Sequence, residues 1–176
     1  TAPDFTLKNT KKEDVSLSNF KGKRVVLAFY PGAFTGVCDT EMCKLKEDME
    51  AFNEMDTTVL GISVDSPWAN AAFAEKYDLN FELLSDLDRS ATKDYDFLFE
   101  GLGGIEGYTC ANRGVVIVDS EGTIKYRWVA EPNPGVEPNY DEIKDFMNGN
   151  NQNATLIELS CEKVQDKSIA VLAKEV

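Results

Sequence analysis

Three runs of strand length, almost unbroken in apolar character, constrain the fold of this chain more than any other feature. They span residues 24–30, 57–64 and 114–118, are rich in β-branched or aromatic side chains, and are each followed at once by proline or aspartate. A strand that faces water on one side alternates apolar and polar residues, whereas a strand buried on both faces does not. The runs therefore predict three central strands.

Helical periodicity fills the interval between the first two runs. Apolar residues recur there at steps of three and four positions with charged residues on the opposite side, which predicts an amphipathic helix with one buried stripe. The stripe consists of Met42, Leu45, Met49 and Phe52. A second helix is expected to begin near Pro67, because proline suits the first helical turn, and to extend to about Tyr77.

Beyond the third run, the turn-forming residues 119–122 and the segment 123–129 predict a β-hairpin with that strand. A loop rich in proline comes next, and helical spacing resumes over residues 140–147. Strand, helix, strand, followed by strand, strand, helix, is the element order of an α/β thioredoxin-like three-layer sandwich. We expect that fold, with a central mixed β-sheet.

The chain of 176 residues is long enough for one sizeable core and too short for two full domains. We assign residues 1–148 to the thioredoxin-like domain and residues 149–176 to a carboxy-terminal extension. An asparagine-rich linker begins the extension, and the segments 155–164 and 168–174 then suit a hairpin, an edge strand, a dimer element or a helix.

Composition removes several classes of function. A net charge of −13 repels phosphate backbones and anionic membrane surfaces, so nucleic acid is not an expected partner. No apolar run has membrane-spanning length and no basic segment precedes an apolar stretch at the amino end, which favours a cytoplasmic location and no membrane partner. The absence of histidine excludes Ser-His-Asp and Cys-His catalysis together with histidine metal sites.

The chemistry must then use other side chains, and the cysteines are the first to consider: Cys38, Cys43, Cys110 and Cys161. They lack the paired spacing of a zinc site, so no metal or other cofactor is expected. In a cytosolic chain, cysteines are more often redox-active or buried than cross-linked. Cys38 follows a buried strand and a Pro-Gly turn, near the first turn of a predicted helix, where free N–H groups and the helix dipole favour a thiolate. The alternative is a buried cysteine that acts as a small hydrophobe.

The residues around Cys38 carry a family resemblance. Pro31, Thr35 and Cys38 match the active-site pattern of peroxiredoxins, which is proline, three residues, threonine or serine, two residues, cysteine. Also typical of the family are Phe34, Val37 and Glu41. The segments 2–5, 61–65 and 112–119 resemble other parts of it, so the resemblance covers residues 1 to about 148. It implies a cysteine-dependent peroxidase that reduces hydrogen peroxide and organic hydroperoxides.

The resemblance also implies roles for the residues near the thiolate. Attack on a peroxide oxygen needs positive charge and hydrogen-bond donors that lower the thiol pKa and stabilise the leaving oxygen. By resemblance these tasks fall to Arg113 and Thr35, while Pro31 shields the thiolate from water and Glu41 orients Arg113. Each residue also has a plainer interpretation when taken singly. Arg113 suits a surface charge and Thr35 a helix cap. Pro31 suits a strand terminator, and Glu41 a carboxylate in a first helical turn.

The sulfenic acid left on Cys38 must condense with a second thiol, and thioredoxin or a similar dithiol then reduces the product. Cys43 is the expected partner, because its five-residue spacing resembles the bacterioferritin-comigratory type of peroxiredoxin. In an intact helix that spacing puts the Cα atoms roughly 8.6 Å apart, and a disulfide seldom spans more than about 7 Å. The helix must therefore unwind between them. The alternative partners are Cys110 and Cys161, the latter from the second chain of a homodimer.

Two other functions share the predicted fold. A thioredoxin-type disulfide oxidoreductase needs two cysteines about two residues apart at the helix start, a spacing that Cys38 and Cys43 exceed. A non-catalytic binding module or holdase would depend on its surface and not on Cys38. The tail adds a structural alternative, since residues 170–176 placed before residues 1–5 read like the run-up to the family's opening. A chain permuted in this way would bring Thr1 close to Val176.

Overall fold

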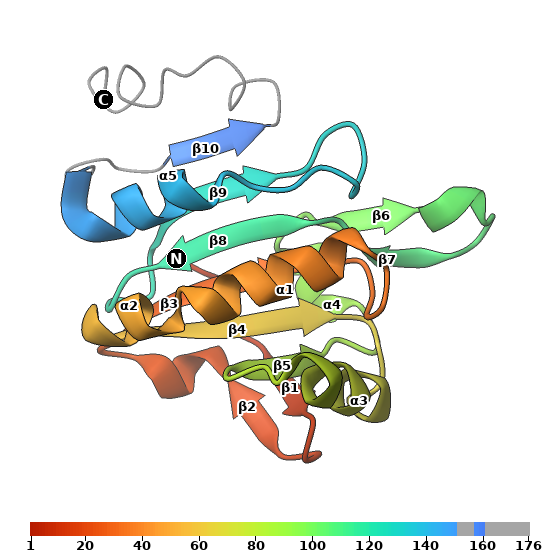
Figure 1. Cartoon of the computed structure of the whole chain (residues 1–176), viewed down its shortest axis with the longest axis horizontal. Helices are drawn as coiled ribbons and strands as arrows, with labels where there is room; N and C mark the ends of the chain where they lie inside the picture. Colours follow the sequence, from red (N-terminus) through yellow and green to blue (C-terminus); the bar gives the residue numbers. More distant parts are fainter. Residues whose placement is uncertain (151–156, 161–176) are drawn as a thin grey trace.

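The computed structural model describes residues 1–150 and 157–160. Within these residues the centre is a mixed sheet in the order β10-β9-β8-β3-β4-β5-β1-β2 (Figure 1). Its strands are β1 (Thr6–Asn9), β2 (Asp14–Ser16), β3 (Arg24–Phe29), β4 (Thr57–Ser63), β5 (Glu82–Ser85), β8 (Gly114–Val118), β9 (Ile124–Val129) and β10 (Ile157–Ser160). Two further strands, β6 (Leu98–Glu100) and β7 (Thr109–Ala111), form a hairpin that projects from one end of the sheet.

The three strands predicted from the apolar runs lie at the middle of the sheet. β3 pairs in parallel with β4 and antiparallel with β8, so that Val26 faces Val59 on one side and Ile117 on the other. Every residue of β8 is buried, as are all but one in each of β3 and β4. The expectation of strands covered on both faces is confirmed, and so is the hairpin of β8 with β9.

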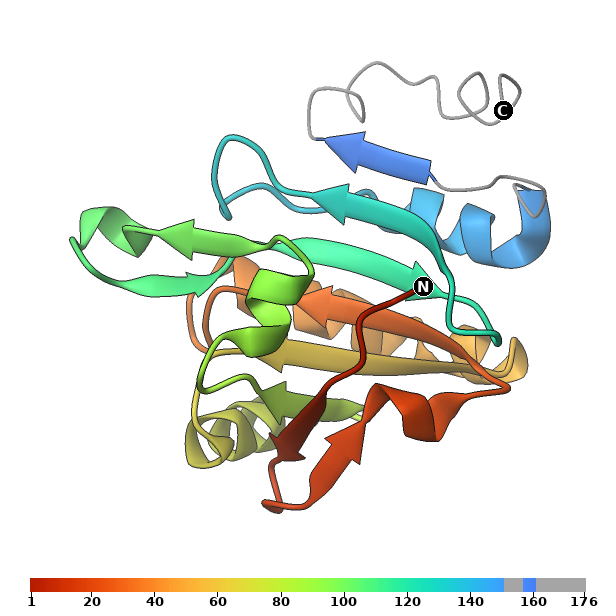
Figure 2. The same ribbon diagram turned by 180° about the vertical axis from the view of Figure 1, so that it is seen from behind.

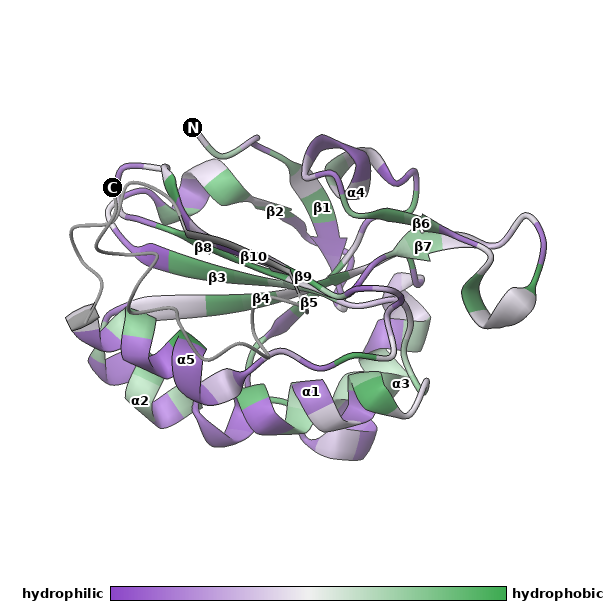
Figure 3. Cartoon of the chain, turned by 90° about the horizontal axis from the view of Figure 1, so that it is seen from above, coloured by the Kyte–Doolittle hydropathy of each residue, from purple (hydrophilic) through white to green (hydrophobic). Residues whose placement is uncertain are grey.

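Helices cover the sheet on both faces, which confirms the α/β three-layer arrangement. One face carries α1 (Val37–Glu47), α2 (Met49–Glu54), α3 (Pro67–Tyr77) and α5 (Tyr140–Asp145), and the other carries α4 (Ser90–Asp94) and the short 3-10 helix η1 (Leu17–Phe20) (Figures 2 and 3). β3 contributes alternate side chains to the two layers of core. Val26 and Ala28 join the core beneath α1, and Leu27 and Phe29 join the core beneath α4.

The predicted helices are present with one difference. The apolar stripe Met42, Leu45, Met49 and Phe52 is buried as expected, but it runs over two helices, because α1 ends at Glu47 and α2 begins at Met49. Asp48 stands between them in the right-handed helical region, but its ψ near −2° differs from the value of about −42° in a regular α-helix. The second predicted helix is α3, whose first N–H groups include one that donates to the Ser66 hydroxyl at 3.2 Å.

Short elements complete the domain, and sequence periodicity did not indicate them. They are β1, β2, β5, β6, β7 and α4, each of five residues or fewer. The carboxy-terminal helix predicted over 140–147 is α5 followed by a wider π-type turn, η3 (Phe146–Asn150).

Beyond residue 150, the tail is described only at β10, which pairs in parallel with β9 at the edge of the sheet. The remainder of the predicted extension, Cys161 included, lies outside the described residues. So does Val176, and the proximity of the two chain ends expected of a permuted chain stays a prediction. No helix in the ranges 1–150 and 157–160 combines the length and apolar character needed to cross a membrane.

Candidate active site

Cys38 lies in the first turn of α1, beyond the end of β3. The chain leaves the strand at Tyr30 and turns into the helix at Gly36, whose φ of 59° is one that side-chain-bearing residues rarely adopt. This sharp entry places the Cys38 sulfur beneath the loop, where the residue is 0% exposed. The expectation of a cysteine at a helix start is confirmed, and burial now adds a cost to ionising its thiol.

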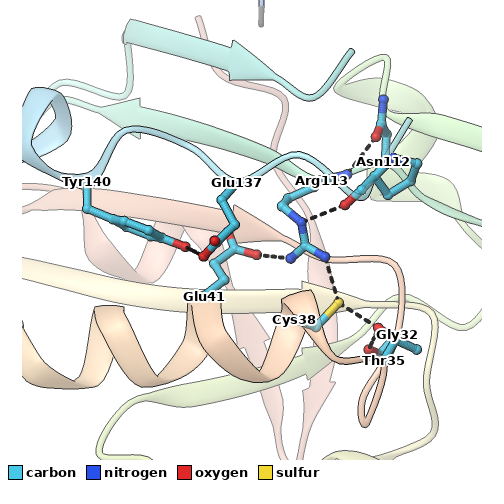
Figure 4. A network of polar contacts seen from close by, with 9 residues as sticks. Gly32, Thr35, Cys38, Glu41, Asn112, Arg113, Glu137 and Tyr140 are labelled. Carbon is cyan, nitrogen blue, oxygen red and sulfur yellow. Dashed lines mark hydrogen bonds and ion pairs between the residues drawn. The ribbon is translucent and has the colours of Figure 1, made fainter. Parts of the chain in front are cut away.

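Arg113 reaches Cys38 because of strand pairing. β8 runs antiparallel to β3, and Gly114 is opposite Phe29, so the residue before β8 lies beside the end of β3. The Arg113 Nη2 donates a hydrogen bond to Cys38 Sγ at 3.0 Å, Nη1 donates to a carboxylate oxygen of Glu41, and Nε donates to the Pro134 carbonyl at 2.9 Å (Figure 4). The arginine is 1% exposed. Three acceptors thus hold the guanidinium in one orientation, in which Nη2 points at the sulfur.

Thr35 approaches the same sulfur from the loop. Its Oγ1 lies 2.8 Å from Cys38 Sγ and 2.7 Å from the Gly32 carbonyl oxygen. A hydroxyl has one proton, so Thr35 can donate to only one of these acceptors at a time. Ionisation of Cys38 favours the sulfur, because a hydrogen bond to a charged acceptor is the stronger of the two.

The electrostatics of Cys38 reflect opposing effects. Burial raises the pKa of the thiol above its ordinary value, while Arg113, the Thr35 hydroxyl and the backbone of Gly32 lower it. Burial alone would lower the pKa of Arg113, but the charges of Glu41 and Cys38 raise it, so the guanidinium stays positive. The positive charge available to a thiolate, or to an oxygen that becomes negative beside it, is therefore permanent.

Glu41 is the acidic member of the group. It is 0% exposed, and burial raises its pKa from 4.5 to about 7 even though Arg113 lowers it. Its second oxygen, Oε1, has no hydrogen-bond partner among the described residues. Glu137 adds repulsion from the other side and accepts a hydrogen bond from the Tyr140 hydroxyl at 2.8 Å. The Glu41 carboxyl therefore changes charge near neutral pH while it contacts Arg113.

A residue that motif reasoning did not single out orders the loop before Cys38. Asp65 follows β4, and its Oδ2 accepts hydrogen bonds from the Ala33 N–H at 2.8 Å and from the Ser63 hydroxyl at 2.9 Å. β3 and β4 are parallel neighbours, so the residues after both strands meet at one edge of the sheet. The sequence feature that could have indicated this role is the position of Asp65 directly after the second apolar run.

The remaining predicted residues lie nearby with different surroundings. Pro31 is buried at the start of the loop. Cys43 is half-buried on α1, which runs as continuous helix from Cys38 to Cys43, and Cys110 is buried in β7, where burial raises its pKa to about 11. All three described cysteines are free thiols. The structure thus joins Cys38, Thr35, Arg113 and Glu41 in one hydrogen-bonded group and leaves Cys43 farther along the helix.

Two known protein families match parts of the chain. The AhpC/TSA family matches residues 1–127, and the UPF0367 protein family matches residues 134–176. A putative peroxiredoxin bcp of Haemophilus influenzae is 39% identical over 123 residues, which are 70% of this chain and 79% of that protein. The peroxiredoxin Bcp of Bacillus subtilis is 36% identical over 129 residues, 72% and 81% of the two chains.

The chain is also similar to plant peroxiredoxins and to solved peroxiredoxin structures. The chloroplastic peroxiredoxin Q of Sedum lineare is 43% identical over 119 residues, 66% of this chain and 64% of that protein. The reduced 2-Cys peroxiredoxin of Plasmodium vivax superposes with a TM-score of 0.74 at 30% identity, covering 86% of this chain and 80% of that one. The peroxidoxin BcpB of Mycobacterium tuberculosis superposes with a TM-score of 0.73 at 25% identity, covering 84% of this chain and 94% of that one.

Proposed function

The chain belongs to the AhpC/TSA family, and we propose that it acts as a cysteine-dependent peroxidase in which Cys38 is the residue that attacks the hydroperoxide. The observation that carries this assignment is the convergence of two donors, Arg113 Nη2 at 3.0 Å and Thr35 Oγ1 at 2.8 Å, on the Cys38 sulfur. Glu41 supports it by holding Arg113 from the other side.

The first step transfers one oxygen atom. The Cys38 thiolate attacks the nearer peroxide oxygen, an S–O bond forms, and the O–O bond breaks. The other oxygen leaves with the electron pair and takes a proton to become water or an alcohol. Negative charge therefore moves from the sulfur to an oxygen beside it, within reach of donors already aimed at the sulfur. Such donors lower the barrier because they need no reorganisation as the charge moves.

The second step would return the sulfur to the cycle through Cys43. The Cys43 sulfur bonds to the Cys38 sulfur, the S–O bond breaks, and the hydroxyl leaves as water with a proton. A dithiol reductant, which we infer to be thioredoxin or a similar protein, then supplies two electrons to the disulfide. Because α1 is continuous between the two cysteines, this step requires that part of the helix to unwind.

Several finer expectations from the sequence belong to the same proposal. Hydrogen peroxide and organic hydroperoxides are the proposed substrates, a homodimer the proposed assembly and the cytoplasm the proposed location. We also propose a domain of residues 1–148 and an extension of residues 149–176. Of the two family matches, the first ends at residue 127 and the second begins at residue 134.

The decisive experiment measures peroxide reduction, insulin reduction and holdase activity for the protein and for its Cys38→Ser variant. Loss of peroxide reduction in the variant, with no insulin reduction by the wild type, supports the proposal. Peroxide reduction that survives in Cys38→Ser contradicts it, and so does a holdase activity without peroxidase turnover. Mass spectrometry of the peroxide-treated protein then identifies the partner of Cys38. A Cys110→Ser variant is the matched control, expected to retain turnover if Cys43 is that partner.

A further inference from the structure

One stripe of α1 faces the carboxy-terminal end of α3. Asp39, Cys43 and Lys46 are spaced by four and three residues, which places them on one side of the helix. The hydroxyl of Tyr77 donates to Asp39 at the start of this stripe. At its far end, Lys46 Nζ donates to the Tyr77 carbonyl at 3.1 Å and lies 3.4 Å from the Asp78 carboxylate. Tyr77 and Asp78 therefore contact α1 before and after Cys43 in the sequence, and α3 lies beside α1 below the sheet in Figure 3.

Tyr77 belongs to a group that also contacts the loop before Cys38. Its ring meets the Phe73 ring edge-on at 5.3 Å, and Phe73 packs at 5.2 Å against Phe34 of that loop. Lys76 Nζ lies over the rings of both Phe34 and Tyr77, at 5.4 Å and 5.3 Å. The end of α3 thus holds the loop and the first turn of α1 together.

The hydrogen bond to Asp39 is the specific part of this contact. It raises the pKa of Tyr77 above its ordinary value, because the carboxylate accepts the proton that the hydroxyl would have to release. The other oxygen of Asp39 is buried and has no hydrogen-bond partner among the described residues. Asp39 follows Cys38 directly, so the first turn of α1 cannot unwind without moving the carboxylate to which Tyr77 donates.

We propose that Tyr77 is a positioning residue that restrains the unwinding of α1 and thereby sets how fast Cys43 reaches oxidised Cys38. The proposal rests on the roles assigned above to Cys38 and Cys43. While the hydrogen bond to Asp39 persists, α1 stays wound between Cys38 and Cys43 and the Cys38 sulfenic acid persists. A second peroxide molecule can then add another oxygen, forming a second S–O bond as its O–O bond breaks and releasing water or an alcohol. The product is a sulfinic acid that thiols do not reduce.

Tyr77→Phe tests this role, because it removes the hydroxyl and keeps the ring that packs on Phe73. Reduced protein is mixed with hydrogen peroxide and quenched with an alkylating reagent, and mass spectrometry follows the sulfenic acid, the Cys38–Cys43 disulfide and the sulfinic acid. Loss of one hydrogen bond to a carboxylate predicts roughly tenfold faster disulfide formation. We expect less sulfinic acid at equal peroxide and an unchanged rate of Cys38 oxidation, a combination that general destabilisation does not produce.

Two further variants keep the interpretation secure. Tyr95→Phe is the matched control, since it also loses one tyrosine hydroxyl, which donates to the Pro3 carbonyl at 2.7 Å from the opposite face of the sheet. It should leave disulfide formation unchanged. Asp39→Asn weakens the same hydrogen bond from the other partner, because it removes the charge, and should change the rate in the same direction by less.

The outcomes separate the inference from the function beneath it. Disulfide formation in Tyr77→Phe at the wild-type rate, in a protein that does form the Cys38–Cys43 bond, overturns the role of Tyr77 alone. Failure of the wild type to form that bond at all overturns both this role and the assignment of Cys43. Equal acceleration in Tyr95→Phe also overturns the role, because the effect would then follow from lower stability.

Discussion

Replacing Arg113 by lysine separates the fixed geometry of the guanidinium from its charge. Arg113 donates to Cys38 Sγ at 3.0 Å, to Glu41, and to the Pro134 carbonyl at 2.9 Å. Lysine keeps a positive charge but carries it on one nitrogen at the end of a flexible chain, which cannot reach three acceptors at once. With Arg113 only 1% exposed, water has little access to replace the lost donors.

The size of the effect follows from the bond to sulfur. A hydrogen bond to a charged acceptor contributes about 1.5–3 kcal/mol, and each 1.36 kcal/mol changes a rate tenfold. The second-order rate constant for peroxide should therefore fall about 10-fold to 150-fold in Arg113→Lys. The charge of Arg113 is the largest effect that opposes the rise in the Cys38 pKa caused by burial. Lysine keeps that charge, so the pKa of Cys38 should rise further only to the extent that the lysine nitrogen lies farther from the sulfur than the guanidinium does.

Competition kinetics with hydrogen peroxide measure that rate constant, and the pH dependence of Cys38 alkylation measures the thiol pKa. Arg24→Lys is the matched control, because Arg24 Nη1 also donates to a backbone carbonyl, that of Met147 at 2.8 Å, on a side chain that does not contact Cys38. A wild-type rate and an unchanged Cys38 pKa in Arg113→Lys would refute the argument that the guanidinium geometry activates the sulfur.

Three further predictions concern the site and the core. Thr35→Val should lower the peroxide rate constant about tenfold through loss of the hydroxyl that donates to the sulfur, and Thr35→Ser should restore it. Between pH 4.5 and about 7 the native protein keeps a proton on Glu41 that the unfolded chain has already released. The free energy of unfolding should therefore fall, as pH rises through that window, by on the order of 2–3 kcal/mol; urea titrations below and above it should show a smaller change for Glu41→Gln. Gly114→Ala would place a Cβ 2.6 Å from the Phe97 ring, and should cost about 1–3 kcal/mol of unfolding free energy by urea titration; an equal stability would contradict the packing argument.

Much of the central fold could be predicted because burial leaves a local record in the sequence. A strand covered on both faces requires apolar residues throughout, and that is what the runs leading into β3, β4 and β8 contain. Helix α3 was indicated equally well by Pro67 at its first position. β5 was missed because the burial of its last three residues follows from its place between β4 and β1, which a four-residue pattern does not record.

The candidate site divides in the same way. The sequence by itself determined that Cys38 would start a helix after a buried strand, and the spacing of Pro31, Thr35 and Cys38 indicated its chemistry. Only the tertiary structure decided which charges surround the sulfur. Arg113 stands 75 positions away and arrives through the register of β8 against β3, while Tyr77 meets Asp39 through the packing of α3 on α1. Periodicity and capping act within a few residues, whereas these contacts depend on strand register and helix packing, which form only when the whole core assembles.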